Sequence, residues 1–509
     1  MLRKYPISLQ SFRKIRQGDY VYIDKTEVIH QIVDTDQYYF LSRPRRFGKS
    51  LLIDTINELF NGSKALFEGL WIYDKWDWSV TNPVIRFSFS NMGIRTAGLE
   101  TAIYVALEEN ANRLGIPLTK KEYDLRFKEL IEKAAIGGPV VILIDEYDKP
   151  IIDFLEDPGM VDANRSVMKN FYSILKDSDE HIRFLLITGV SQFSQVSIFS
   201  DLNNLRNITL SSQFGDIVGI TQQELETNFS QEIARMQIDR PDILSQIKQW
   251  YDGYTWNMQT WVYNPFSLLN FMDEPIFRNY WYATGTPTFL LKQLKKKAIY
   301  DVEDYEMGGL ALASFDTNHL DVAALLFQTG YLTIKNIDQN GQELYKLGFP
   351  NLEVKSSLLN GLLSIYRAGL GVDSLSLVAK INKALNTYDI EGLILQLNAM
   401  FAETPYDRWK ADTESIFHII TYLTFKLAGV NVYTEVHSAM GRSDITVKTD
   451  LYIYVLELKL DSTAAVALQQ IKDKAYLAPY ASDSRKKIAV GISFSSKDRK
   501  VEQFQFEEL

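Results

Sequence analysis

The sequence predicts an α/β protein of several domains, with a parallel-sheet core, a helical and winged-helix-like middle region, and a C-terminal domain with the element order αβββαβ. Its 509 residues correspond to two to four domains, at about 100 to 200 residues per domain. Three patterns lead to this prediction: continuous apolar runs in the first part, helical periodicity in the middle, and alternating strand-like and helical runs near the end. We expect domains at 1–221, 222–400 and 401–509.

The parallel sheet is predicted from short apolar runs that alternate with helical stretches. These runs are rich in β-branched and aromatic residues and have no polar alternation, which is typical of strands covered by helices on both faces. They are Tyr38–Leu41, Val84–Phe87, Val140–Ile144 and Phe184–Ile187.

The middle region is predicted to be mostly helical, with one hairpin. The runs 331–334 and 344–347 flank Asp338-Gln339-Asn340-Gly341, which is a turn sequence. Helices followed by a hairpin indicate a winged-helix-like piece. Two interpretations stay open for it: a structural lid or connector, and a contact for nucleic acid.

The C-terminal domain is predicted from the order of its elements. A helix over 411–428 ends at Gly429, since glycine is common just past a helix end. The other elements are strands over 430–436, 444–447 and 451–460, a helix over 463–476, and a last strand over 487–492.

Composition excludes several classes of site. The net charge is −10, so bulk charge does not attract nucleic acid, although residues 401–509 carry 14 Lys and Arg against 15 Asp and Glu. The sequence has no cysteine, and its five histidines show no pair at helical i, i+4 spacing, so a metal would sit on carboxylates. Because the start lacks a signal-peptide pattern and no apolar run approaches about 20 residues, we expect a soluble cytoplasmic protein with no membrane partner.

A phosphate-binding loop is predicted where the first strand passes into a helix. The segment Ser42-Arg43-Pro44-Arg45-Arg46-Phe47-Gly48-Lys49-Ser50 has the strand, loop, helix context of a Walker A motif, with Arg43 at the usual first glycine. Gly48 would let the backbone turn around a phosphate, Lys49 would neutralise its charge, and the Ser50 hydroxyl would bind Mg²⁺. A solvated basic loop is the alternative interpretation of this segment.

Acids at the end of the 140–144 strand favour the nucleotide interpretation. Ligands of open α/β sheets bind at the carboxyl ends of the strands. Asp145 would hold the Mg²⁺ shell, and Glu146 would orient the attacking water. Thr188, at the end of another strand, would sense the γ-phosphate. The nucleotide-binding residues we assign are Arg45, Arg46, Phe47, Gly48, Lys49, Ser50, Leu51, Asp145 and Thr188.

These motifs resemble those of bacterial AAA-ATPase-like proteins. The resemblance rests on the loop 43–50, on Leu143-Ile144-Asp145-Glu146-Tyr147-Asp148, on Thr188-Gly189-Val190-Ser191, and on Tyr22-Ile23-Asp24-Lys25-Thr26, Tyr251-Asp252-Gly253-Tyr254 and Tyr263-Asn264-Pro265-Phe266. Proteins of that family carry the Arg-Pro-Arg-Arg-Phe-Gly-Lys-Ser loop, which implies ATP as the ligand. The resemblance assigns no arginine finger, although Arg206 is one possibility, and homo-oligomerisation is expected only by analogy with AAA rings.

A second site is predicted in the C-terminal domain. Strand periodicity places Glu457 and Lys459 on one face, and a short connection folds Asp444 back toward them. Asp444 and Glu457 would bind Mg²⁺, with Glu414 completing the site, and Lys459 would orient water or neutralise charge. His418 is interpreted as a core histidine.

The αβββαβ order, with its Asp and Glu-x-Lys on the second and third strands, is similar to the PD-(D/E)XK, or restriction-endonuclease-like, fold. This resemblance implies that Gln470 positions substrate or water. It also implies a nuclease acting on DNA or RNA. Our hypothesis is that ATP controls a Mg²⁺-dependent nuclease. The alternative is an ATP-driven switch or scaffold whose nuclease-like domain binds nucleic acid or protein without cleavage.

Overall fold

The computed structural model describes residues 4–35, 37–192, 198–199, 202, 204–283, 288–297, 299–313, 321–338, 343–367, 375–404, 413–429, 431–438 and 441–509. The chain forms two compact units. The first contains Met1–Gly285 and Val302–Val354, and the second contains Thr286–Asp301 and Lys355–Leu509. The predicted middle region, 222–400, is therefore shared between them. Its boundaries at 221 and 400 stay predictions.

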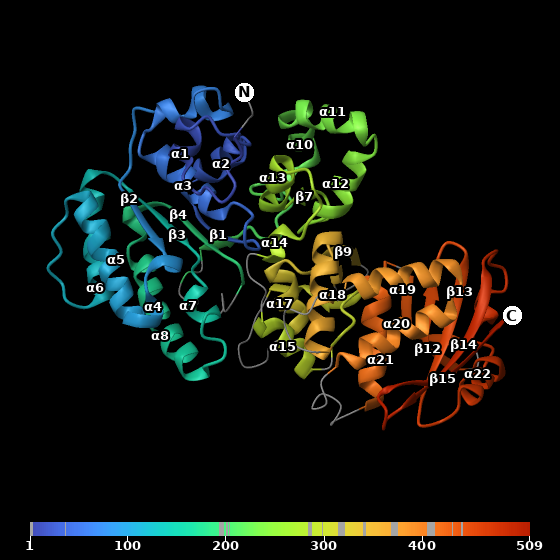
Figure 1. Ribbon diagram of the computed structural model, residues 1–509. Helices are drawn as coiled ribbons and strands as arrows, with labels where there is room; N and C mark the ends of the chain where they lie inside the picture. The colour runs from blue at the N-terminus through green and yellow to red at the C-terminus, as the bar shows by residue number, and fades with distance from the viewer. Residues whose placement is uncertain are drawn as a thin grey trace. The chain divides into compact units, whose positions relative to one another are not determined.

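A parallel sheet forms the centre of the first unit, as predicted (Figure 1). Within the described residues it has five strands in the order β2-β3-β4-β1-β5. Every residue of β3 is buried, as in a strand covered on both faces. The short edge strand β5 was not predicted from the sequence. The strands are β1 (Tyr38–Ser42), β2 (Val84–Ser88), β3 (Val140–Asp145), β4 (Ile182–Gly189) and β5 (Leu205–Asn207).

Helices surround this sheet (Figure 1). Phe127 of α6 and Phe171 of α8 stack with ring centroids 4.4 Å apart, and both rings meet Phe87 of β2 edge-on. The helices are α1 (Phe12–Gln17), α2 (Thr26–Val33), α3 (Lys49–Phe60), α4 (Ile94–Ala97), α5 (Leu99–Leu114), α6 (Tyr123–Ala134), α7 (Lys149–Ile152) and α8 (Pro158–Asp177).

The rest of the first unit is a helical group followed by a small antiparallel sheet. Apolar residues of the helical group share a core with Val21. The helical group contains β6 (Ile220–Thr221), α10 (Gln222–Asn228), α11 (Ser230–Asp239), α12 (Ile243–Tyr251), β7 (Val262–Tyr263), α13 (Pro265–Asp273) and α14 (Tyr280–Ala283). After it come β8 (Tyr305–Gly308), α16 (Gly309–Ala313), α17 (Val322–Thr329), β9 (Thr333–Asp338) and β10 (Leu344–Gly348).

The predicted hairpin is confirmed, since β9 and β10 pair antiparallel. Its turn, 339–342, lies outside the described residues. The structure adds β8 on the other side of β10. The helix α17 precedes the hairpin, as the predicted order of helix and hairpin requires.

The second unit contains a mixed sheet with helices, and the predicted αβββαβ order is confirmed. In its described part the strand order is β11-β12-β13-β14-β15, with β13 and β14 parallel. The edge strand β15 was not predicted. The elements are α15 (Thr288–Lys296), α18 (Leu352–Arg367), α19 (Leu375–Thr387), α20 (Ile390–Ala402), α21 (Thr413–Leu427), β11 (Asn431–Ser438), β12 (Gly441–Lys448), β13 (Tyr452–Leu460), α22 (Ala464–Asp473), β14 (Lys486–Ser495) and β15 (Lys500–Glu508).

No helix in the part of the chain described by the structure is long and apolar enough to cross a membrane.

Position 253, in the Tyr251–Tyr254 motif, requires glycine because of its backbone conformation and because of a close contact. Its φ is +103°, and a Cβ atom built there would lie 2.2 Å from the carbonyl oxygen of Pro350. Gly115, at the end of α5, also has a positive φ of +68°, but a Cβ there would meet no atom within 4 Å. Alanine at 253 would therefore face both a less favourable φ and a close contact, whereas alanine at 115 would face only the cost of a left-handed φ.

We expect Gly253→Ala to lower the melting temperature clearly more than Gly115→Ala. Gly115→Ala carries a conformational cost of about 1 kcal/mol, and Gly253→Ala carries a larger one, because its φ lies further from the left-handed region that alanine can adopt. Gly253→Ala adds about 1–3 kcal/mol of overpacking against a backbone atom. Thermal unfolding followed by circular dichroism checks this difference. Equal shifts for the two variants would mean that Pro350 moves away without cost.

Candidate functional site

The loop between β1 and α3 wraps around the side chain of Lys49. The Lys49 Nζ atom donates hydrogen bonds to the carbonyl oxygens of Arg43 and Pro44, each at 2.9 Å. Gly48, just before the helix, has φ +98°, which glycine adopts freely, and Arg46 has φ +69°. Burial lowers the pKa of Lys49, and the nearby Asp145 and Glu146 carboxylates act against that shift. The loop therefore turns tightly around the Lys49 side chain, directly before the first turn of α3.

Asp145 and Thr188 meet where their strands end. The Thr188 hydroxyl donates to Asp145 Oδ1 at 2.7 Å, and both residues are buried. Thr188 of β4 is the register partner of Leu41 of β1, which leads into the loop. The sheet therefore brings Lys49, Asp145 and Thr188 to one edge, as ligand sites of parallel sheets require.

Glu146 follows Asp145 in an unusual backbone conformation. Its φ is +52°, which is uncommon for a residue with a side chain and is frequent at functional sites. Burial raises the pKa of Glu146, and the charge of Asp145 raises it further, whereas Lys49 and Lys149 lower it. The side chain lines the same polar cavity as Lys49.

Asp148 belongs to this site but was missed by the sequence reasoning. Its Oδ2 atom accepts three hydrogen bonds, from the backbone N–H of Val190 at 3.0 Å and from the N–H and hydroxyl of Ser191, both at 2.7 Å. Burial raises the pKa of Asp148, although these donors act in the opposite direction. Asp148 thereby joins the loop after β3 to the loop after β4. The feature of the sequence that could have identified Asp148 was its position three residues after Asp145.

Arg43, which replaces the usual glycine, has a structural role. Its guanidinium is fully buried and donates to the carbonyl oxygens of Thr209 at 2.8 Å and Phe214 at 3.2 Å. It also lies 4.0 Å from the centre of the Trp256 ring, as in a cation–π contact. Burial lowers the pKa of Arg43 to about 9, so the group is still charged at neutral pH. Arg43 thus fixes the start of the loop.

Of the other loop residues, Phe47 is buried in the protein, and Arg45 and Arg46 are exposed. Phe47 is buried and packs edge-on against Tyr254, with ring centroids 4.8 Å apart. Arg46 is exposed, and its guanidinium lies 4.9 Å from the centre of the Phe266 ring. Arg45 is also exposed and lines the polar cavity. Arg206, the candidate arginine finger, is exposed on the edge strand β5, near the Tyr39 ring.

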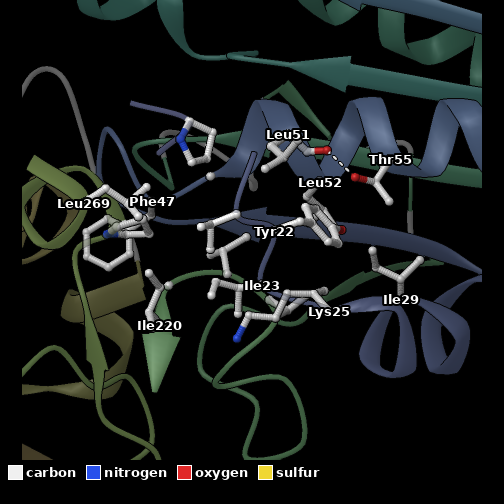
Figure 2. Close-up of a pocket in the computed structure, with 17 residues that line it drawn as sticks. Tyr22, Ile23, Lys25, Ile29, Phe47, Leu51, Leu52, Thr55, Ile220 and Leu269 are labelled. Atoms are coloured by element: carbon white, nitrogen blue, oxygen red, sulfur yellow. Dashed lines mark hydrogen bonds between the residues drawn. The ribbon is translucent and has the colours of Figure 1, made fainter. Parts of the chain in front are cut away.

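A polar cavity and an apolar cavity meet at the loop. The polar one, of about 450 Å³, is lined by Lys49, Ser50 and Glu146. The apolar one, of about 100 Å³, is lined by the side chains shown in Figure 2, which include Tyr22, Ile23 and Leu52. The residues that line both cavities are Pro6, Gly48, Leu51, Pro265 and Leu269.

The second candidate site lies in the mixed sheet of the second unit. The Lys459 Nζ atom lies 2.9 Å from Glu457 Oε1, and the Gln470 side chain of α22 donates to the same oxygen. Asp444 Oδ2 accepts the backbone N–H of Leu458 at 2.8 Å. The structure therefore brings Asp444, Glu457, Lys459 and Gln470 together.

Glu457 has a second oxygen that is suited to a cation. The side chain is 1% exposed, and Oε2 is buried and has no hydrogen-bond partner among the described residues. Burial raises the pKa of Glu457, and the neighbouring Asp444 charge raises it further, whereas Lys459 lowers it. A carboxylate oxygen left without a partner is costly unless a cation or proton meets it, so the donors present fit a Mg²⁺ ion.

Other predicted members of this site are placed only in part. Glu414 belongs to α21, but its side chain lies outside the described residues. Among the side chains that are described, no group of three or more His, Asp or Glu residues could hold a metal ion. The His418 Nε2 atom lies 3.4 Å from the carbonyl oxygen of Asp444, and its ring meets Tyr300 edge-on.

Comparison with known proteins matches a family to each of the two regions that contain these candidate sites. Residues 6–199 match the family described as Predicted AAA-ATPase, and residues 412–504 match the PD-(D/E)XK nuclease superfamily. A protein of Azotobacter chroococcum mcd 1, named "Uncharacterized protein in vnfD 5'region", is 40% identical over 520 residues, covering 100% of this chain and 99% of that protein. The chain therefore belongs to a family of predicted AAA-ATPases that carry a C-terminal domain of the PD-(D/E)XK nuclease superfamily.

Proposed function

We propose that this protein binds and hydrolyses ATP at the loop around Lys49, and that ATP controls a Mg²⁺-dependent nuclease at Asp444 and Glu457. The observation that carries the ATP proposal is the pair of adjoining cavities. The polar cavity offers Lys49, Ser50 and Glu146, which suit phosphates, and the apolar cavity offers a place for a base.

The nucleotide would lie across the loop. Its phosphates would meet the free N–H groups and positive dipole end of α3, while Arg45 and Arg46 add positive charge at the rim. Lys49 would exchange its two carbonyl partners for phosphate oxygens. The base would enter beside Leu51, which lines both cavities.

Hydrolysis would use the acids at the end of β3. Bound Mg²⁺, held by the Ser50 hydroxyl and Asp145, would neutralise charge on the phosphates. Glu146 would accept a proton from the water that attacks the γ-phosphorus, and the bond from phosphorus to the bridging oxygen would break. Thr188, which is hydrogen-bonded to Asp145, would fix that carboxylate and sense the γ-phosphate.

The C-terminal site would cut phosphodiester bonds in DNA or RNA. Asp444 and Glu457 would hold Mg²⁺, which would acidify a water and stabilise charge on phosphorus. Lys459 and Gln470 both donate hydrogen bonds to Glu457 Oε1, so they would orient that carboxylate and, through it, the water. The buried Oε2 atom, for which the described part of the chain offers no hydrogen-bond partner, supports this assignment.

The second candidate function is an ATP-driven switch or scaffold whose nuclease-like domain binds without cutting. The ion pair between Lys459 and Glu457 favours it, because a lysine neutralises the carboxylate that a metal would otherwise occupy. The cleavage experiment below decides between the two candidates.

We expect Glu146→Gln to reduce ATP hydrolysis about 10²–10⁴-fold while ATP binding is retained. The amide keeps the shape of the side chain but does not accept a proton from water. Phosphate release measures turnover, and calorimetry with MgATP measures binding. The control is Glu132→Gln on α6, an exposed acid outside both cavities, which should match the parent. Equal and measurable turnover in Glu146→Gln and parent would remove Glu146 from the mechanism.

We expect Asp444→Asn and Glu457→Gln each to abolish Mg²⁺-dependent cleavage of single- and double-stranded DNA and RNA in the presence of ATP. Each change weakens the carboxylate pair that would hold the ion. Gel electrophoresis of labelled substrates measures cleavage, and EDTA should stop it in the parent.

The control for these variants is Glu502→Gln on the exposed edge strand β15, which should cut as the parent does. If the parent cuts no substrate with Mg²⁺ and ATP, yet binds nucleic acid or a protein in an ATP-dependent way, the switch or scaffold function is correct.

A further inference from the structure

Trp281 of α14 directly contacts the loop of residues 43–48 between β1 and α3, which is called the phosphate loop below because of its proposed ligand. Its indole Nε1–H donates to the carbonyl oxygen of Arg45 at 3.1 Å, and the residue is only 5% exposed. Its ring packs against Tyr331, with ring centroids 5.0 Å apart. A buried indole N–H needs an acceptor, and here the acceptor is in the loop that would surround the phosphates.

Glu353 holds Trp281 from the first turn of α18. The backbone N–H of Trp281 donates to Glu353 Oε1 at 2.7 Å, and the Glu353 side chain is fully buried. Burial raises the pKa of Glu353 to about 7, while hydrogen bonds from Trp281 and Ser267 act in the opposite direction. A buried carboxyl group is costly, so its hydrogen bonds matter for the local structure.

A second set of contacts links the same turn to the loop. The Asn351 Nδ2 atom donates to the carbonyl oxygen of Asp252 at 2.9 Å, and Gly253 lies against Pro350. Tyr254, the next residue, packs on Phe47 of the loop. The residues just before and within the first turn of α18 thus reach Arg45 through Trp281, and Phe47 through Gly253 and Tyr254.

We propose that Trp281 is a positioning residue for the phosphate loop and that Glu353 holds Trp281, so that the first turn of α18 responds to the conformation of the loop. The proposal rests on the proposed ATP site for its ligand, but its contacts do not depend on ATP.

The test is hydrogen–deuterium exchange of the full-length protein without nucleotide. Trp281→Phe removes the indole N–H and keeps an aromatic ring, so amides in residues 43–50 should exchange about fivefold faster, the effect of losing one hydrogen bond. Glu353→Ala should act in the same direction, and Glu353→Gln, which keeps an oxygen acceptor, should stay near the parent. Trp261→Phe, at a tryptophan that is 43% exposed, is the matched control and should change nothing.

The double variant Trp281→Phe/Glu353→Ala decides whether the two residues act in series. Its exchange should not exceed that of the stronger single variant, because Glu353 acts through Trp281. Additive effects, or unchanged exchange in residues 43–50 of Trp281→Phe, would overturn the proposal. If Trp281→Phe does not fold, the comparison of Glu353→Ala with Glu353→Gln decides: equal exchange in the loop refutes it.

A separate measurement keeps this proposal distinct from the proposed function. With MgATP, Trp281→Phe should raise KM about fivefold and change kcat less, because the loop binds phosphate but does not transfer the proton. A parent protein that binds no ATP would refute the proposed function. The exchange results in the nucleotide-free protein would still decide the role of Trp281.

Discussion

Burial of the Arg43 guanidinium is the constraint on which the loop between β1 and α3 depends. Removing a full positive charge from water is costly unless acceptors surround it, and here two carbonyl oxygens from 209–214 and the face of Trp256 do so. The direction of the chain at the end of β1 is therefore set by a side chain. A glycine at this position would leave the turn to backbone conformation alone. This explains how a loop without its first glycine still forms a tight turn around Lys49.

Sequence reasoning predicted the parts of the fold whose signal is local. The strands β1 to β4 are continuous apolar runs, and α22 and β14 follow a clear change of period. Five strands of the described part of the chain were missed: β5, β6, β7, β8 and β15. Each is short, charged or mostly exposed, and pairing with a neighbour, rather than its own pattern, makes it a strand.

The candidate sites show the same difference between features with a signal in the sequence and features that depend on tertiary structure. Lys49, Asp145 and Thr188 could be predicted because strand ends in a parallel sheet converge, and Asp444 could be placed near Glu457 because a short connection folds the hairpin. Trp281 and Glu353 could not be predicted, since they lie more than 200 residues from Arg45 along the chain. Only tertiary structure brings a tryptophan to that carbonyl group, and composition or periodicity carries no sign of it.

The division of the chain into units has a practical consequence for dissecting the protein. Residues 286–301 of the second unit lie in sequence between the two segments of the first, and the last boundary falls within α18. No single cut or truncation therefore releases either unit whole. A fragment that starts at residue 355 would lack α15 and would begin inside a helix, without its first turn. A free C-terminal domain would have to be made by fusing 286–301 back onto it, and its activity in isolation would describe a molecule with a new chain order.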